Sequence, residues 1–173
     1  LPPMLRGEVA WCQGFSEPGA GSDLASATTR AEKQSDGSYR VTGHKVWTTL
    51  GHKAKWMILL ARTDPAAGKY AGLSFFLFPM DAPGVTVQPL VKMSGEGGFN
   101  QVIFDKAPMP KSALLGQLGQ GWQIAMTTLT FERGAAEGTG GGQTTPTESS
   151  ARAVAKLAAR VRRPDGPAGH PAA

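Results

Sequence analysis

The chain has 173 residues, 40% of them hydrophobic, which is enough for one domain of ordinary size with its own core. Its formal net charge is +5, and residues 151–173 contribute most of it through five Lys and Arg side chains against Asp165. The rest of the chain is nearly neutral, and no aromatic residues alternate with the arginines of this segment, so the charge does not predict a nucleic-acid partner. The single cysteine, Cys12, excludes an intrachain disulfide and suits a reducing compartment, and we therefore expect a cytoplasmic location.

No apolar run reaches the roughly 18 residues of a membrane-spanning helix, and we expect no membrane span. The first residues show no basic segment followed by an apolar run, so they do not resemble a targeting signal. The sequence starts at Leu1 rather than at an initiator Met, which suggests that it begins inside a longer chain.

Short apolar or alternating runs separated by Gly, Pro and Asp turns fill residues 8–106, a pattern typical of an antiparallel β-domain. Strands at this spacing make a sandwich or a partly closed barrel. The predicted strands are residues 8–15, 27–33, 39–45, 46–49, 56–63, 73–79, 85–89 and 101–105.

The period changes in residues 120–133, where apolar side chains recur every three or four residues and predict a helix. After Ala136 the sequence is rich in Gly and Thr and then in Arg, Ala and Pro, with few large apolar side chains. We therefore predict a mainly β chain divided into a β-domain (1–112), a helical segment (113–136) and a basic tail (137–173) that is disordered or the product of a shifted reading frame.

The first candidate site is the segment 11–23, where a strand runs into a loop rich in small residues. Small residues let the backbone approach a ligand closely, and successive N–H groups near Ser22 would make a concavity suited to a pyrophosphate. Ser16 presents a hydroxyl where the strand ends. The alternative interpretation is an ordinary Gly/Ser/Asp turn, since short Gly patterns are weak signals.

The second candidate site is the segment 43–51, which carries one large aromatic residue and two hydroxyl residues. The face of Trp47 could shield a flat ring system from water, and a neighbouring Thr could donate to a ring heteroatom. Taken alone, a Trp in a β-domain is also explained by core packing.

Together the two segments closely resemble the acyl-CoA dehydrogenase family. The similarity rests on Ser-Glu-Pro-Gly-Ala-Gly-Ser-Asp at 16–23 and Lys-Val-Trp-Thr-Thr at 45–49, and it extends over residues 11–133. Trp56-Met57 with the strand that follows, Phe104-Asp105 and Gly121-Trp122 come in the family's order. The resemblance implies the family's middle β-domain, FAD as cofactor, an acyl-CoA substrate, an electron-transfer flavoprotein as acceptor and a homodimeric or homotetrameric parent.

The resemblance also implies roles for individual residues. The flavin ring would lie along Gln13, Phe15 and Ser16 on one side and Trp47 and Thr49 on the other, with Gly21 and Ser22 near the pyrophosphate and the acyl-CoA. The implied reaction removes a proton α to the thioester and transfers a hydride from the β carbon to flavin N5, leaving a trans-2-enoyl-CoA; a carboxylate suits the proton transfer.

The carboxylate that would act as base is Glu132, because some relatives place the base next to an Arg on the first helix after the β-domain. The alternatives are that Glu132 is a plain exposed helix carboxylate and that the base lies further downstream. Arg133 would orient the helix or bind the substrate. We assign structural roles to Glu17 and Asp23. No metal site is predicted, because His44 and His52 have no Cys or carboxylate partner at ligand spacing.

Two segments depart from the family's pattern. Residues 92–100 differ near the expected acyl-CoA site, which leaves the substrate type open, whereas residues 106–110 are expected to be a connector whose changes affect only local packing. The family's other helical domains are also missing. We therefore expect a fragment that holds FAD at one end only and is inactive alone.

Other functions fit the same residues. The chain could belong to an acyl-CoA oxidase or a flavin monooxygenase of the same fold. It could also be a non-catalytic β-module that binds acyl-CoA or a protein partner through the apolar side of residues 122–131.

Overall fold

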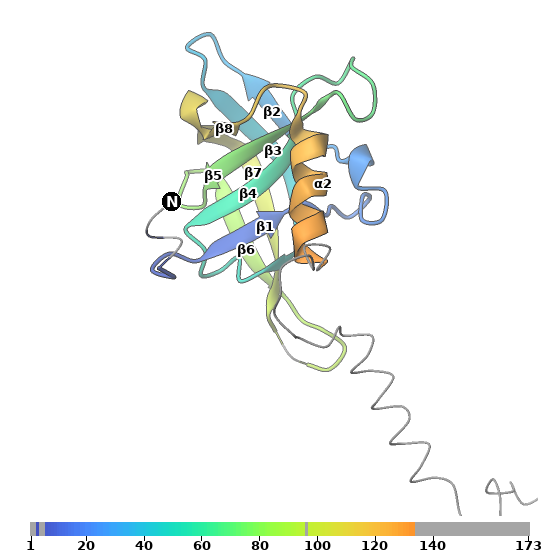
Figure 1. The fold of residues 1–173 in the computed structure, drawn as a ribbon. Coiled ribbons are helices and arrows are strands. Elements are labelled where there is room, and N and C mark those ends of the chain that lie inside the picture. Colours follow the sequence, from blue (N-terminus) through green and yellow to red (C-terminus); the bar gives the residue numbers. More distant parts are fainter. Residues whose placement is uncertain (1–2, 4–5, 96, 134–173) are drawn as a thin grey trace, which may run out of the picture. The chain divides into compact units, whose positions relative to one another are not determined.

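Eight strands joined mostly by short connections form one sheet, and a single helix follows it (Figure 1). The computed structural model describes residues 3, 6–95 and 97–133, so the tail predicted for residues 137–173 lies outside the described residues. The elements are β1 (Trp11–Gly14), the 3-10 helix η1 (Leu24–Ser26), β2 (Arg30–Lys33), β3 (Tyr39–Thr49), β4 (Trp56–Arg62), β5 (Leu73–Pro79), β6 (Val85–Leu90), β7 (Phe99–Met109), the 3-10 helix η2 (Lys111–Ala113), β8 (Leu114–Leu115) and α2 (Gly121–Glu132).

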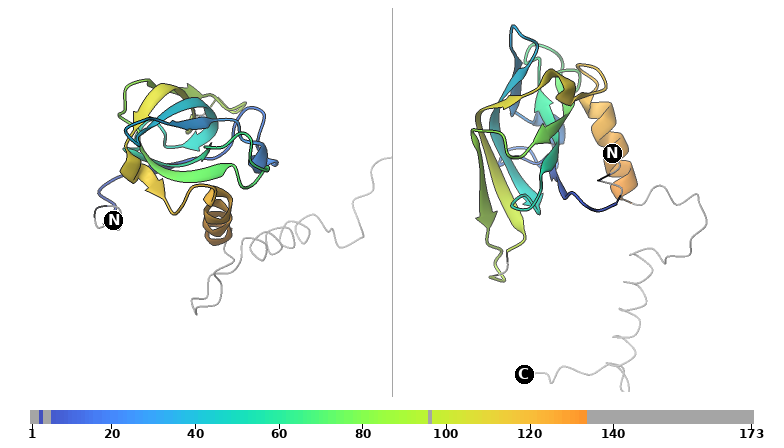
Figure 2. Two further views of the ribbon diagram at one scale, coloured as in Figure 1. Left: turned by 90° about the horizontal axis from the view of Figure 1, so that it is seen from above. Right: turned by 90° about the vertical axis from the view of Figure 1, so that its left-hand side faces the viewer.

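The strands lie in the order β6-β7-β3-β2-β4-β5-β8, and β1 pairs with β4 outside this path. Neighbours are antiparallel except that β1 runs parallel to β4, with Trp11 opposite Trp56, and β2 meets β4 in parallel at one residue pair. Figure 2 shows the sheet curling around an interior, with α2 on its outer side. The predicted mainly β architecture followed by one helix is confirmed, and the predicted helix 120–133 agrees with α2.

The prediction of separate strands at 39–45 and 46–49 was wrong, because β3 is one strand of 11 residues. Both parts pair with β7, and the register shifts between Val41 and Gly43 and again between Lys45 and Thr48. Irregularities of this kind bend a strand without ending it. The second one contains Trp47, whose φ of 59° lies in the left-handed region.

Residues 106–110 are not the connector that we expected, because β7 continues to Met109. Ala107 lies opposite Val41 and Met109 opposite Tyr39 in the β3–β7 ladder, and both side chains are buried. Substitutions at these positions therefore enter the core of the sheet. The two-residue strand β8, which the sequence analysis did not predict, pairs Leu114 with Phe76 of β5.

The core has two parts, one on each face of β4 and β5. Leu59 and Phe76 belong to the cluster inside the curled sheet, whereas the neighbouring Leu60 and Phe75 belong to the cluster under α2. Because side chains alternate along a strand, burial on both faces explains why these strands read as continuous apolar runs. Gly121 and Ala125 are the buried residues of α2. Within the described residues, no helix is long and apolar enough to cross a bilayer.

Candidate functional site

A cavity of about 480 Å³ opens where β1, the end of β3 and the end of α2 come together. Its lining is mainly aromatic and aliphatic, with a few hydroxyl, amide and carboxyl groups. The lining residues are Trp11, Cys12, Gln13, Phe15, Ser16, Val46, Trp47, Thr49, Leu50, Ile58, Phe99 and Glu132.

Gln13, Phe15 and Ser16 form what we call the β1 wall of this cavity. Phe15 is buried and packs edge to face on Phe75, with ring centroids 5.7 Å apart, so the wall is anchored in the cluster under α2. Gly14 is required for close packing, since a Cβ atom there would lie 2.2 Å from the sulfur of Met57. The wall ends at Ser16, which is half-buried at the cavity edge.

Trp47, Thr49 and Leu50 form the opposite β3 wall. Trp47 and Leu50 both have positive φ values, 59° and 57°. Bulky residues adopt such a conformation rarely, and it tends to be found at binding and catalytic sites. The Trp47 side chain remains 60% exposed although one of its edges meets Phe99. An exposed indole in a cavity is well suited to cover a flat apolar ligand.

A buried ion pair connects the two walls. The Lys45 ammonium donates to a carboxylate oxygen of Glu17 at 2.8 Å and to the carbonyl oxygen of Phe15 at 3.0 Å. The Glu17 carboxylate also accepts hydrogen bonds from the backbone N–H groups of Thr28 and Thr29. Both charged side chains are buried, with 0% and 4% of their surface exposed. The structural role predicted for Glu17 is confirmed.

The charge state of the pair follows from these contacts. Burial by itself raises the pKa of Glu17, but Lys45 and the hydrogen bonds from Thr28 and Thr29 outweigh it and lower the pKa to about 2. Glu17 is therefore ionised at neutral pH. Burial raises the pKa of the Cys12 thiol to about 12, so this cavity residue stays protonated and is a poor nucleophile.

The cavity brings together six of the residues that the sequence singled out. These are Gln13, Phe15, Ser16, Trp47, Thr49 and Glu132. The other three, Gly21, Ser22 and Arg133, are exposed and do not line it. Gly21 and Ser22 lie in the loop before η1, and Arg133 follows the last residue of α2.

Sequence reasoning missed Lys45 and several apolar lining residues. Tyr39, Val41, Gly43 and Lys45 alternate along β3, and Lys45 therefore falls on the face that carries the buried Tyr39 and Val41. A lysine at such a position needs a buried partner, which is a signal that could have identified the pair with Glu17. Leu50, Ile58 and Phe99 carry no comparable signal, because only the folding of three separate segments brings them together.

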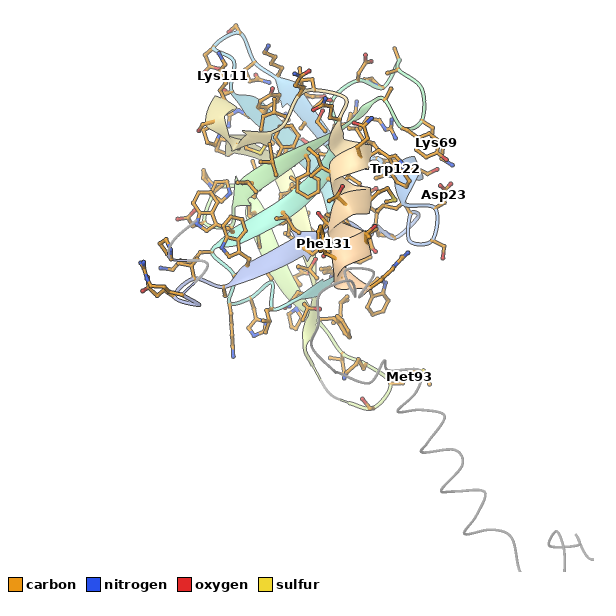
Figure 3. The ribbon with its side chains drawn as sticks, viewed as in Figure 1. Asp23, Lys69, Met93, Lys111, Trp122 and Phe131 are labelled. Atoms are coloured by element: carbon orange, nitrogen blue, oxygen red, sulfur yellow. The ribbon has the colours of Figure 1, made fainter. Side chains whose placement is uncertain are left out.

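Asp23 also has a structural contact, on the surface directly before η1. Its carboxylate accepts hydrogen bonds from Lys69 at 2.7 Å and from the Ser26 hydroxyl at 2.6 Å. Figure 3 shows Asp23 and Lys69 side by side. Because both charged groups are exposed, this pair contributes little to stability. His44 and His52 form hydrogen bonds with Gln101 and Asn100, respectively.

Comparison with known proteins identifies the family of the chain. The family described as "Acyl-CoA dehydrogenase, middle domain" matches residues 12–107. The acyl-CoA dehydrogenase IpdE1 of Mycobacterium tuberculosis is 48% identical over 134 residues, which cover 78% of this chain and 34% of that protein. The acyl-CoA dehydrogenase FadE34 of the same organism is 48% identical over 133 residues, 77% of this chain and 19% of the relative. The chain thus spans about a fifth to a third of these relatives.

Solved structures give the same result. The structure titled "Tcur3481-Tcur3483 steroid ACAD" superposes with a TM-score of 0.72 at 35% identity, covering 76% of this chain and 34% of the other. The butyryl-CoA dehydrogenase of Megasphaera elsdenii superposes with a TM-score of 0.71 at 32% identity, covering 76% of this chain and 34% of that one.

Proposed function

The chain belongs to the acyl-CoA dehydrogenase family, and on that premise we propose that its cavity binds the ring system of FAD beside the thioester of an acyl-CoA. The observation that carries the proposal is the pair of facing walls. An exposed indole, Trp47, lies across one cavity from the hydrogen-bonding side chains of Gln13 and Ser16. A planar ring with polar heteroatoms along one edge requires this combination of apolar cover and directed donors.

The size and lining of the cavity fit such a group. A volume of about 480 Å³ lies within the range of small-molecule sites, and the lining is mostly apolar with few polar groups. Thr49 adds a second hydroxyl on the β3 wall. We assign Gly21 and Ser22 to the pyrophosphate and the acyl-CoA, because their exposed loop follows directly from the β1 wall.

In the proposed reaction, an acyl-CoA loses its α proton and β hydride to become a trans-2-enoyl-CoA. FAD, when bound, supplies the hydride acceptor. Glu132 lines the cavity from the end of α2 and is the candidate that takes the α proton, while the neighbouring Arg133 orients this helix end or meets the substrate. Trp47 and Phe15 exclude water from the ring, and Ser16 and Thr49 orient it.

The complete activity belongs to a longer assembly, in our proposal. Since the chain spans only part of its relatives, we infer that FAD is held at one end here and that further helical segments complete the site. The proposed setting is a cytoplasmic homodimer or homotetramer that passes electrons to an electron-transfer flavoprotein. One of the similar structures is titled as an electron transferring flavoprotein of Acidaminococcus fermentans, which supports this choice of acceptor.

A second candidate function is a binding module without catalysis. Phe131 on α2 is 67% exposed, and an apolar side chain of this size at a helix surface suits a protein partner (Figure 3).

Titration of the chain with FAD, followed by flavin fluorescence, separates the two candidates. Saturable binding that weakens in Trp47→Ala supports the flavoprotein, and a folded chain that leaves FAD free supports the module. In the longer assembly that we propose, with FAD bound, an acyl-CoA added without oxygen should bleach the flavin absorption. The variant Glu132→Gln should keep FAD binding and lose the bleaching. Bleaching of this variant at the original rate would show that Glu132 is not the base.

A further inference from the structure

We propose that the buried Lys45–Glu17 pair is a positioning device that fixes the peptide between Phe15 and Ser16 and thereby sets the two cavity walls against each other. Neither residue lines the cavity, and neither is assigned a role in binding above. The identity of the ligand rests on the proposed function, but the positioning of the walls does not.

The pair connects three separate segments of the chain. Lys45 belongs to β3, two residues before Trp47, and its ammonium donates to the Phe15 carbonyl at 3.0 Å. Glu17 follows the β1 wall. Its carboxylate accepts hydrogen bonds from the Lys45 ammonium at 2.8 Å and from the backbone N–H groups of Thr28 and Thr29 at 2.7 and 2.9 Å. The end of β1, the middle of β3 and the segment before β2 are thus tied together at one buried point.

The β1 wall is held from β3 at two consecutive carbonyl groups. The carbonyl of Phe15 accepts from the Lys45 ammonium, and the carbonyl of Ser16 accepts from the backbone N–H of Val46 at 2.9 Å. Because residues 45 and 46 immediately precede Trp47, any displacement of one wall is transmitted to the other. These two contacts therefore couple the position of the β1 wall to that of the β3 wall.

The contact with Lys45 also changes the Ser16 N–H group. In a trans peptide the N–H points opposite to the carbonyl, so the Ser16 N–H points away from the ammonium. It donates no hydrogen bond to any other residue in the described part of the chain. A carbonyl that accepts from a cation makes the N–H of the same peptide a stronger donor. Ser16 thus offers a polarised N–H beside its hydroxyl at the cavity edge.

Stability alone is a weak reason for this arrangement. Replacing a buried ion pair by apolar side chains of similar volume is often neutral or stabilising, because both charges lose their hydration in the folded state. This pair accepts hydrogen bonds from two backbone N–H groups and donates one to a backbone carbonyl. Its role is therefore better explained by the backbone geometry that these hydrogen bonds impose.

The test uses the whole chain with both charges removed, Lys45→Met with Glu17→Gln, which avoids leaving one buried charge without its partner. The matched control is Arg30→Met with Glu32→Gln, because that pair is exposed and lies outside the cavity. The first measurement needs no ligand: amide proton and nitrogen resonances of Ser16, Trp47 and Thr49. We expect the Ser16 proton to shift upfield and the Trp47 and Thr49 signals to move or broaden, while the control leaves all three in place.

The second measurement is the FAD dissociation constant beside the melting temperature. We expect affinity to fall by about tenfold, the effect of one charge-assisted hydrogen bond, with melting within a few degrees of the original chain. Unchanged resonances at Ser16 and Trp47, or a loss of affinity that only follows a loss of folding, would overturn the proposal. If the original chain does not bind FAD, the resonances alone decide the positioning role, and the failure counts against the proposed function.

Thr28→Ala provides a milder variant should the double substitution fail to fold. It removes the hydroxyl that donates to Glu17 at 2.8 Å and keeps the backbone N–H contact. The Ser16 and Trp47 resonances should then move in the same direction by a smaller amount. Their complete constancy would contradict a link from Glu17 to the walls.

Discussion

The indole of Trp47 meets the ring of Phe99 edge to face, with centroids 5.9 Å apart and planes inclined by 85°. The contact supports one edge of Trp47 from β7 and leaves the side chain 60% exposed. Its backbone lies in the left-handed region at the second register shift of β3. A strained backbone and an exposed aromatic ring at one position are expected where binding, rather than folding, requires the residue.

Replacing Trp47 by Gly should therefore separate binding from stability. Gly adopts a positive φ without strain, so we expect the free energy of unfolding to change by less than about 1 kcal/mol. FAD affinity should fall by about tenfold or more, because the apolar cover of the ring is lost. Leu118→Ala, at another exposed apolar residue outside the cavity, is the control and should leave FAD affinity unchanged. Equal affinities in the Trp47 variant and the original chain would contradict the assignment of the β3 wall.

Acid should destabilise the chain through Glu17. The pKa of Glu17 is about 2 in the folded protein and about 4.5 when it is unperturbed, so the unfolded state binds the proton more readily. The stabilisation, roughly 3 kcal/mol, is fully present above pH 4.5 and is lost as the pH falls toward 2. Urea unfolding between pH 7 and 3 measures the larger part of this loss. The double variant Lys45→Met with Glu17→Gln should lose less stability over this range, and parallel curves for both proteins would contradict the prediction.

Replacement by Ala should affect stability differently at two glycines of the site segments, Gly43 and Gly21. At Gly43 a Cβ atom would lie 2.7 Å from the Cα of Thr29, so we expect a loss of about 3 kcal/mol of stability. At Gly21 a Cβ atom meets nothing within 4 Å, and stability should change by less than about 0.5 kcal/mol. If Gly21 borders the pyrophosphate, FAD affinity should nevertheless fall in Gly21→Ala. Thermal melting measures the stability of both variants, and FAD titration measures their affinities.

The hydroxyl of Thr48 is buried and forms no hydrogen bond with any residue that the structure describes. Replacing it by Val removes a polar group that folding takes out of water, so we expect a gain of about 1 kcal/mol. Thr49→Val is the matched control, because Thr49 is exposed and its hydroxyl keeps access to water. A lower melting temperature for Thr48→Val would show that the hydroxyl has a partner in the folded protein.

Local sequence patterns were sufficient to predict α2, β4 and β5. The apolar spacing of residues 120–133 predicted α2, and short apolar runs bounded by turn residues predicted β4 and β5 nearly to the residue. Local patterns failed where pairing with another strand decides how far a strand extends. β3 continues past Lys45 because both of its parts pair with β7, and β7 continues to Met109 because β3 accompanies it. Neither fact can be read from one segment alone.

The same division applies to the site. Gln13, Ser16, Trp47 and Thr49 could be selected because two local motifs carry them, and the structure brings them to one cavity. Lys45 lies in the second motif and Glu17 in the first, but the role of Lys45 depends on contacts with residues 28 and 30 positions away along the chain, and neither motif alone predicts that pairing. Whether Gly21, Ser22 and Arg133 contact a ligand remains a prediction, since the cavity does not include them.

The two ends of the strand order have a consequence for how the chain behaves in solution. An edge strand with free N–H and C=O groups can pair with an edge strand of another molecule, which leads to aggregation. At one edge, β8 has only two residues, and at the other, β6 carries Pro89, which has no N–H group to donate. The strands at both ends of the order therefore carry features that disfavour pairing with a further strand, and we expect them to limit edge-to-edge association at high protein concentration.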